Sequence, residues 1–241
     1  MTRCQALSTG LLLAVFGCEA IEPAPDAGFI EAPERMGTHA ELPFHKVWIK
    51  PGVEVRNDYR KLYVAPVNSD YLHEMGWYDK ESDRYKAGEF DQDIKDLVAY
   101  TQTAMIESFR EDENARFEVV SAPGDGVAVL EMALIEVVPS RAVLHAIGWL
   151  PPIGSGALIS ALTPRTVAFE ARIRDGGSRE VIATFADREK QPAGAFDVTR
   201  MTWFGPAKGI IDAWGEQFVE IVNRAPGEII QDPIPYTLKP W

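Results

Sequence analysis

The sequence predicts an α+β domain in which a mainly antiparallel sheet carries two principal helices on one face, as a two-layer sandwich. Several stretches with the two-residue period of β-strands follow one another in the middle of the chain, and short turns join them. Short turns favour antiparallel neighbours. One long stretch with helical spacing precedes these strands and another follows them, so both helices are expected to cover the same sheet.

The first expected elements are a short strand and a long helix. Leu62–Val67 reads LYVAPV, a β-type run in which Pro66 marks either an edge strand or the end of the strand. Apolar residues then recur at helical spacing over Phe90–Phe109. Asp91 and Asp93 near the start suit the positive end of the helix dipole. The buried side of this helix is expected to contain Phe90, Ile94, Leu97, Val98, Met105 and Phe109.

Four strand-like stretches occupy the middle of the chain. Phe117–Val120 is followed by a turn and by Val127–Val138, which is mostly apolar on both faces and therefore indicates a central strand. Thr166–Arg174 alternates more cleanly between apolar and polar residues. The Asp-Gly-Gly turn that starts at Asp175 leads into Glu180–Asp187, which predicts a β-hairpin.

A second helix is expected over Pro206–Asn223. Its buried stripe is predicted to be Ile210, Ile211, Trp214, Phe218, Ile221 and Val222. Together these elements predict one domain over residues 44–223, without internal repeats. The proline-rich tail, residues 224–241, is expected to be a peripheral strap or a disordered end.

The N-terminus resembles the signal peptide of a bacterial lipoprotein, over residues 1–17. Arg3 supplies a positive charge, Ala6–Phe16 is an apolar segment of signal-peptide length, and the VFGC sequence that ends at Cys18 resembles a lipobox. Phe16 is bulkier than the small residue common at its position, and Arg3 is the only charge. An ordinary cleaved signal and an uncleaved segment are therefore the alternatives.

Cysteine usage favours acylation of Cys18. The chain has only Cys4 and Cys18, so cleavage before Cys18 leaves one thiol and no internal disulfide. Acyl chains such as palmitate would consume that thiol, and each buried methylene adds about 0.8 kcal/mol of membrane affinity. The expected partner is thus the membrane, through Cys18. The expected location is the Gram-negative cell envelope, facing the periplasm, with the outer membrane favoured over the inner.

Residues 18–43 are expected to form the acylated cysteine and a flexible tether. The stretch lacks a sustained apolar period, and its prolines are Pro23, Pro25, Pro33 and Pro43. As a flexible coil, roughly 25 residues span about 25–30 Å on average, enough to hold the domain clear of the lipid headgroups. The alternative is an N-terminal arm that packs on the domain.

The charge balance excludes a nucleic-acid partner. Lysine and arginine number 24 against 36 acidic residues, which gives a formal net charge of −12. Such a surface repels polyanions, and no basic run offsets it. No cofactor motif was found either: the Gly-Ser-Gly sequence at Gly154 lacks the Lys and Ser or Thr that follow in a phosphate-binding loop.

Several short motifs resemble an uncharacterised bacterial lipoprotein family, domain of unknown function 3313. The motifs are KVWIKPGV (Lys46–Val53), LYVAPV (Leu62–Val67), EVVPSRAVLHAIG (Glu136–Gly148), the hairpin that ends in Ala186, Asp187 and Arg188, and the segment with Trp203, Asp212 and Trp214. They follow one another in order over most of Lys46–Asn223. The resemblance implies a Gram-negative lipoprotein and supplies no known reaction or ligand.

A stretch without formal charge, Ala142–Pro164, is the strongest candidate contact surface. Pro151, Pro152 and two glycines interrupt it, so it is not a transmembrane helix. One interpretation is an apolar loop that touches the membrane, a ligand or another subunit. The alternative is a buried loop that continues into the next strand. The contact residues predicted by the first interpretation are Trp149, Leu150, Ile153 and Leu158.

No catalytic or metal-binding motif stands out. The four histidines, including His45 and His145, do not pair at zinc-ligand spacing, and no serine stands in a Gly-x-Ser-x-Gly sequence. Asp187 and Arg188 are expected to form a salt-bridged strand end. The carboxylates that a hydrolase would use are Glu131, Glu136, Glu170 and Asp187, which all lie on predicted strands.

Three functions therefore remain open from the sequence. The favoured one is a noncatalytic, membrane-anchored envelope lipoprotein that acts as an interaction or assembly module, with an envelope protein or a second copy as its partner. The second is a periplasmic lipoprotein that binds a small ligand or glycan by stacking on Trp77 and Tyr78, which lie in a polar loop with Tyr85. The third is a carboxylate-dependent hydrolase. No enzyme activity is expected.

Overall fold

A computed structural model describes residues 21–72, 89–137, 165–191 and 205–231 and confirms the α+β class. Six strands form one sheet in the order β1-β6-β5-β4-β2-β3. The strands are β1 (Lys46–Ile49), β2 (Lys61–Val64), β3 (Glu118–Val119), β4 (Val127–Val137), β5 (Arg165–Asp175) and β6 (Val181–Gln191). The described helices are α1 (Val55–Asp58), α3 (Glu89–Arg110) and α6 (Gly205–Asn223), with short 3₁₀ turns at Pro33–Arg35 and Asp70–Leu72.

The sheet is mainly antiparallel, as predicted, with a parallel edge. β4, β5, β6 and β1 pair antiparallel in that order. β2 runs parallel to both β4 and β3. The parallel pairing arises because the chain crosses from β2 to β3 and β4 through the long helix α3, and a crossover of this kind returns the chain in the same direction.

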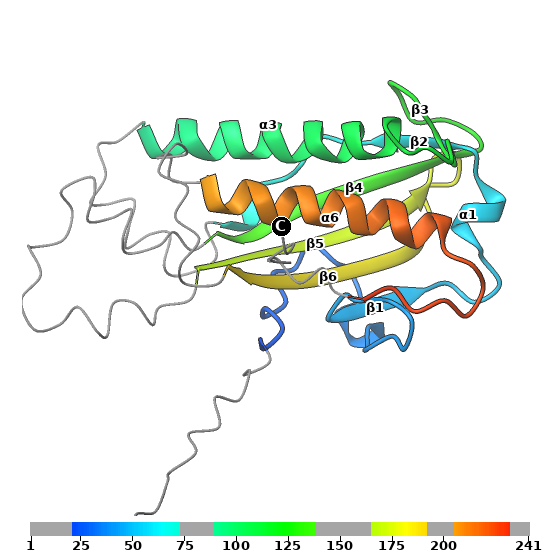
Figure 1. The fold of residues 1–241 in the computed structure, drawn as a ribbon, viewed down its shortest axis with the longest axis horizontal. Coiled ribbons are helices and arrows are strands. Elements are labelled where there is room, and N and C mark those ends of the chain that lie inside the picture. The colour runs from blue at the N-terminus through cyan, green and yellow to red at the C-terminus, as the bar shows by residue number, and fades with distance from the viewer. Residues whose placement is uncertain (1–20, 73–88, 138–164, 192–204, 232–241) are drawn as a thin grey trace, which may run out of the picture.

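The two long helices lie side by side on one face of the sheet (Figure 1). Alternate residues of β4 point to this helix-covered face, among them Leu130, Met132 and Leu134, and all three are buried. Aromatic rings fill the space between the layers. The ring of Phe169 on β5 meets that of Trp214 on α6 edge to face, with centroids 4.6 Å apart.

Most of the predicted elements are confirmed, and the differences lie at their ends. The expected helices match α3 and α6 to within a residue, and the hairpin turn lies between β5 and β6 as predicted. A Cβ atom on Gly176 would lie 2.4 Å from the carbonyl oxygen of Gly124, so this turn requires a glycine. The strand predicted over Leu62–Val67 stops at Val64, before the proline.

The prediction of a flexible tether is wrong for the described residues 21–43. This segment, here called the N-terminal arm, packs on the face of the sheet opposite the helices, where Ala27, Phe29 and Ile30 are buried. The first described residues lie on that side of the sheet (blue in Figure 1). The physical reason is that the central strands are apolar on both faces, so the second face also needs a cover.

The described part of the C-terminal tail lies beside the arm. The amide of Ile230 donates a hydrogen bond to the carbonyl oxygen of Glu41 at 3.0 Å, and the guanidinium of Arg224 pairs with the carboxylate of Glu41. Residues 224–231 therefore hold the end of the arm where it approaches β1.

Candidate functional site

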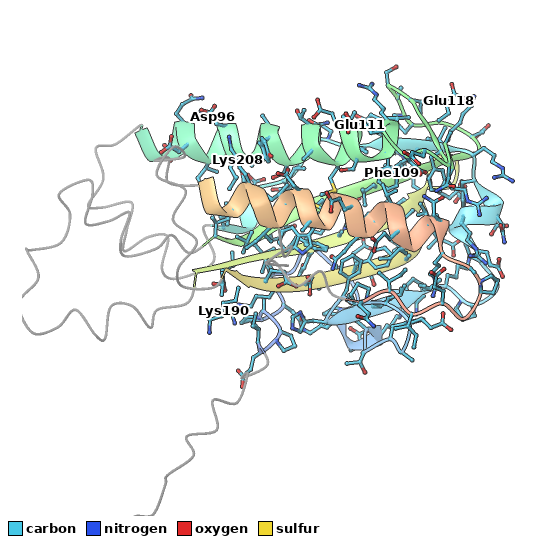
Figure 2. All side chains as sticks on the ribbon, viewed as in Figure 1. Asp96, Phe109, Glu111, Glu118, Lys190 and Lys208 are labelled. Atoms are coloured by element: carbon cyan, nitrogen blue, oxygen red, sulfur yellow. The ribbon has the colours of Figure 1, made fainter. Side chains whose placement is uncertain are left out.

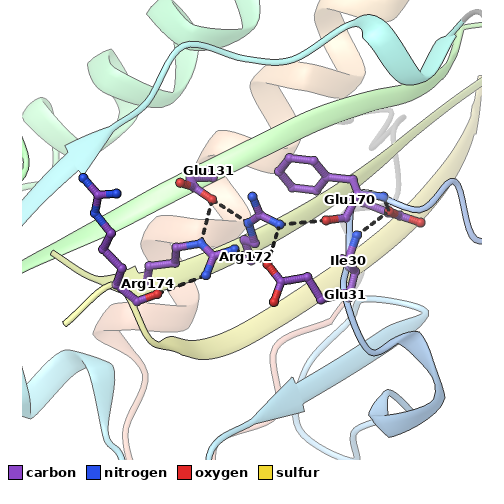
Figure 3. A network of polar contacts seen from close by, with 8 residues as sticks. Ile30, Glu31, Glu131, Glu170, Arg172 and Arg174 are labelled. Atoms are coloured by element: carbon purple, nitrogen blue, oxygen red, sulfur yellow. Dashed lines mark hydrogen bonds and ion pairs between the residues drawn. The ribbon is translucent and has the colours of Figure 1, made fainter.

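The most elaborate polar structure of the described chain is a cluster on the arm-covered face of the sheet. It is here called the arm clamp and comprises Glu131, Glu170, Arg172 and Arg174 (Figure 3). These residues lie on β4 and β5, and the clean alternation of β5 places Glu170, Arg172 and Arg174 on the same face. Each of them reaches the N-terminal arm or holds a residue that does.

Glu170 holds the backbone of the arm. Its Oε1 accepts a hydrogen bond from the amide of Ala27 at 2.8 Å, and its Oε2 accepts from the amides of Phe29 and Ile30 at 3.0 and 3.1 Å. Gly28, with φ of +91°, makes the turn that lets these three amides converge on one carboxylate. Glu170 is only 2% exposed, and the three donors satisfy the charge that burial would otherwise disfavour.

The two arginines extend the clamp along the arm. Arg172 donates to the carbonyl oxygen of Phe29 at 2.8 Å, and its guanidinium lies over the Phe29 ring, 4.3 Å from the centroid. Arg174 donates to the carboxylate of Glu31 at 2.6 Å, and this hydrogen bond lowers the pKa of Glu31. Both arginines also donate to Oε2 of Glu131, at 2.5 and 3.0 Å, so Glu131 fixes the orientation of the two guanidinium groups.

A second polar cluster lies at the other end of the arm and is centred on Asp187. Nδ1 of His45 lies 2.5 Å from Oδ1 of Asp187, and the indole of Trp214 donates to Oδ2 at 2.9 Å. Nε2 of His45 lies 3.0 Å from the carbonyl oxygen of Ile21. Each ring nitrogen of His45 therefore faces an oxygen acceptor, and the amide of Arg188 also lies 3.3 Å from Nδ1.

The environment of His45 favours its charged form. The hydrogen bond to Asp187 raises the pKa of His45, although partial burial lowers it, and the charges of Asp187 and Glu189 raise it further. Asp187 is itself buried. His45 therefore connects a buried carboxylate on β6 to the first described residue of the arm.

Arg188 lies next to Asp187 in the sequence but on the other face of the sheet. Its guanidinium pairs with Glu136 at 2.8 Å and donates to the carbonyl oxygen of Glu22 at 3.4 Å. Glu136 also accepts a hydrogen bond from the hydroxyl of Thr166. Asp187 and Arg188 are thus both ion-paired, as predicted, but with partners on opposite faces, because successive side chains of a strand point to opposite faces.

The four strand carboxylates considered for hydrolysis are all engaged. Glu131 binds two arginines, Glu136 binds Arg188 and Thr166, Glu170 binds the arm, and Asp187 binds His45 and Trp214. They also lie on both faces of the sheet rather than around one point. Among the residues that the structure describes, no group of three or more potential metal ligands converges, and no helix has the length and apolar character needed to cross a membrane.

The predicted contact residues lie outside the described part of the chain. These are the lipid-attachment residue Cys18, the ligand-stacking residues Trp77 and Tyr78, and the partner-contact residues Trp149, Leu150, Ile153 and Leu158. The charge-free stretch Ala142–Pro164 lies outside it as well. The structure describes instead a set of residues that hold the N-terminal arm.

Sequence reasoning missed this role for the arm clamp and for His45. One signal was available: three charged residues alternate through the inner strand β5, and charges on an inner strand need partners. The apolar pair Phe29 and Ile30 in an otherwise polar segment was a second signal. Neither signal identifies which segment lies on which strand, because the contacts join residues more than 140 positions apart.

Comparison with known proteins gives a family but no activity. The model of the family described as "Protein of unknown function (DUF3313)" matches residues 27–218, and its first matched residue is Ala27, the first residue held by Glu170. No curated protein matches the chain.

Two solved structures resemble the chain only distantly. The PelC dodecamer from Paraburkholderia phytofirmans is 10% identical, with 74% of this chain and 96% of that chain covered and a TM-score of 0.41. The protein XCC0632 from Xanthomonas campestris, of the family DUF330, is 12% identical, with 68% and 85% covered and a TM-score of 0.40. Likeness at this level establishes neither a shared assembly nor a shared function.

Proposed function

Because the chain belongs to DUF3313, a family of unknown function, we propose a function from its own residues: a noncatalytic lipoprotein of the Gram-negative cell envelope. In this proposal Cys18 carries the lipid, the domain faces the periplasm from the outer membrane, and it serves as an interaction or assembly module. The partner is an envelope protein or a second copy of the chain.

The observation that carries the proposal is the use of buried and half-buried polar groups to hold the segment that follows Cys18. Glu170 accepts hydrogen bonds from three arm amides, and Arg172 donates to the carbonyl oxygen of Phe29 and lies over the ring of the same residue. His45 lies 3.0 Å from the carbonyl oxygen of Ile21. A domain that holds its own N-terminus in this way has a defined orientation with respect to anything attached there. This property suits an anchored module.

The state of the strand carboxylates supports a noncatalytic role. A glycosidase needs two carboxyl groups that flank the bond to be cleaved, one of them free to donate a proton. In the described residues, Glu131, Glu136, Glu170 and Asp187 are instead paired with arginines, a histidine, an indole or backbone amides. Each therefore has a structural role that accounts for its presence.

The anchor is tested with the cysteine variants. We expect the membrane-extracted chain to have the mass of a protein that starts at Cys18 and carries acyl chains. Cys18→Ser should abolish the mass increase and release the protein from the membrane fraction. Cys4→Ser is the matched control, because Cys4 precedes the expected cleavage site. This variant should leave the mass of the mature chain and its membrane association unchanged. An unacylated wild-type chain would contradict the anchor.

The interaction module is tested with the charge-free stretch. In the lipid-free Cys18→Ser chain, we expect sedimentation to show self-association, or a retained envelope partner, that Ile153→Glu and Leu158→Glu abolish without lowering the melting temperature. Ile229→Glu is the matched control, since Ile229 is apolar and 65% exposed but lies on the tail. Unfolding of the Ile153 and Leu158 variants would favour the buried-loop alternative instead.

A further inference from the structure

The attachment of the N-terminal arm to the sheet begins only a few residues after Cys18, the proposed lipid-bearing residue. Ile21 is held by His45, and only Glu19 and Ala20 separate it from Cys18. The sequence predicted a tether of roughly 25 residues, with a mean span of about 25–30 Å. In the structure only two residues separate Cys18 from the first attached residue of the arm.

Several contacts secure this end of the arm independently. The carbonyl oxygen of Ile21 accepts from His45 at 3.0 Å, and that of the next residue, Glu22, accepts from Arg188 at 3.4 Å. Asp26 pairs with Lys46 at 2.5 Å. The arm clamp then holds the backbone from Ala27 onward. Release of one contact would therefore leave the others to keep the arm on the sheet.

Chain geometry limits the distance between the lipid and the domain. Three peptide units join Cys18 to Ile21, so their Cα atoms are at most about 11 Å apart. We propose that the domain lies directly against the bilayer, with the arm-covered face of the sheet, around Ile21, Arg188 and Lys190, toward the lipid headgroups. The inference rests on the proposed function, because it requires acylation of Cys18.

The orientation follows from the two layers of the domain. The arm lies on one side of the sheet, and α3 and α6 lie on the other (Figure 1). Lys190 projects on the side away from α3, whereas Asp96 projects from α3 and Glu111 lies directly after its end (Figure 2). A lipid attached three residues before Ile21 therefore places Lys190 near the membrane and the outer side of α3 far from it.

Charge favours the same orientation. The exposed charged residues of α3 and its end are acidic Asp91, Asp96, Glu107 and Glu111 and basic Lys95 and Arg110, so acidic charge is in excess and anionic headgroups would repel this side. On the arm-covered side, Asp26 is paired with Lys46 and Glu31 with Arg174, and the other exposed acids of the arm, Glu22 and Glu34, are accompanied by exposed Arg35. Lys190 adds an exposed positive charge there.

The test uses one fluorophore per molecule in vesicles whose headgroups carry a nitroxide quencher. An acylated mature chain has no free thiol, so Lys190→Cys and Lys95→Cys each create a single labelling site. The two variants are matched, because each replaces an exposed lysine, on β6 and on α3 respectively. We expect loss of fluorescence at residue 190 and none at residue 95.

A linker variant separates the short connection from other causes of membrane contact. Insertion of about 20 Gly and Ser residues between Ala20 and Ile21 adds a mean span of roughly 25 Å. The insertion leaves every described contact of the arm in place. We expect the fluorescence at residue 190 to recover while the melting temperature stays the same.

The outcomes distinguish this inference from the proposed function. Mass measurement of the same samples establishes whether Cys18 is acylated, and an unacylated chain overturns both. An acylated chain with equal quenching at residues 190 and 95, or with no quenching at either, overturns the inference alone. Quenching at residue 190 that survives the linker insertion overturns the role of the short connection.

Discussion

The two faces of the sheet are covered in physically different ways. On the helix-covered face, α3 and α6 bury continuous apolar stripes against Leu130, Phe169 and their neighbours. On the arm-covered face, an irregular segment buries only a few apolar side chains and is held by charged groups that bond to its backbone. Apolar area is non-directional, whereas a carboxylate with three amide donors specifies one position. The comparison indicates that the helices supply most of the buried apolar contact and that the clamp determines where the N-terminal arm lies.

The largest effect is expected from the helix-covered face. Phe169→Ala removes a fully buried ring that contacts Phe44, Trp214 and Phe218. We expect the free energy of unfolding to fall by about 3–5 kcal/mol, as for other buried Phe-to-Ala changes. Denaturant unfolding of the lipid-free chain measures it. Phe29→Ala on the arm-covered face is the comparison, and an equal loss there would contradict the division between the two faces.

The next effect concerns the clamp. Glu170→Gln keeps the shape of the side chain but removes the charge and replaces one acceptor oxygen with an amide group that cannot accept the arm amides. We expect a loss of about 1–3 kcal/mol in the free energy of unfolding. We also expect faster proteolysis within the arm, at an unchanged rate of cleavage in α3. Glu118→Gln, at an exposed edge-strand carboxylate, is the matched control. Equal protection of the arm in both variants would show that the clamp is dispensable.

A smaller effect is expected from pH. The pKa of His45 is raised above its ordinary value of 6.5, chiefly by the hydrogen bond to Asp187. A group with a raised pKa in the folded state stabilises it fully below the unfolded pKa, and this contribution is lost as the pH rises through the folded pKa. The attachment of Ile21 should therefore weaken as the pH rises above 6.5.

Hydrogen exchange of the arm amides, followed against pH, checks this expectation. Exchange is compared after correction for its intrinsic pH dependence. His45→Asn should remove the increase in arm exchange above pH 6.5. His39→Asn, at the other histidine of the arm region, should retain this increase. If the increase in arm exchange persists in His45→Asn, a group other than His45 is responsible for the pH dependence.

The smallest effect lies at Gln217 on α6. This side chain is buried, and neither its amide nitrogen nor its amide oxygen has a hydrogen-bond partner among the described residues. Gln217→Leu should raise the free energy of unfolding by about 1 kcal/mol, because an unsatisfied buried amide is removed. Thermal unfolding measures the change, with exposed Gln92→Leu as the control. A destabilised Gln217→Leu would show that the amide has a partner that the variant loses.

The sequence predicted the features that depend on residues close together in the chain, and it did not predict contacts between residues far apart in the chain. The helical spacing from Phe90 to Phe109 is a local pattern, and α3 follows it. The turn between β5 and β6 was equally local. The pairing of His45 with Asp187 joins residues 142 positions apart, and no local pattern records such a contact.

The sequence by itself therefore determined the fold class, the two long helices, the central hairpin and the resemblance to the family, since periodicity and turn chemistry act over a few residues. Tertiary structure decided the position of the arm. Its proline-rich composition predicted a flexible tether, yet an apolar second face of the sheet and the buried Glu170 provide partners that only the folded sheet assembles. The number of residues between Cys18 and the attached part of the arm therefore followed only from the tertiary structure, because it depends on which residues contact Ile21.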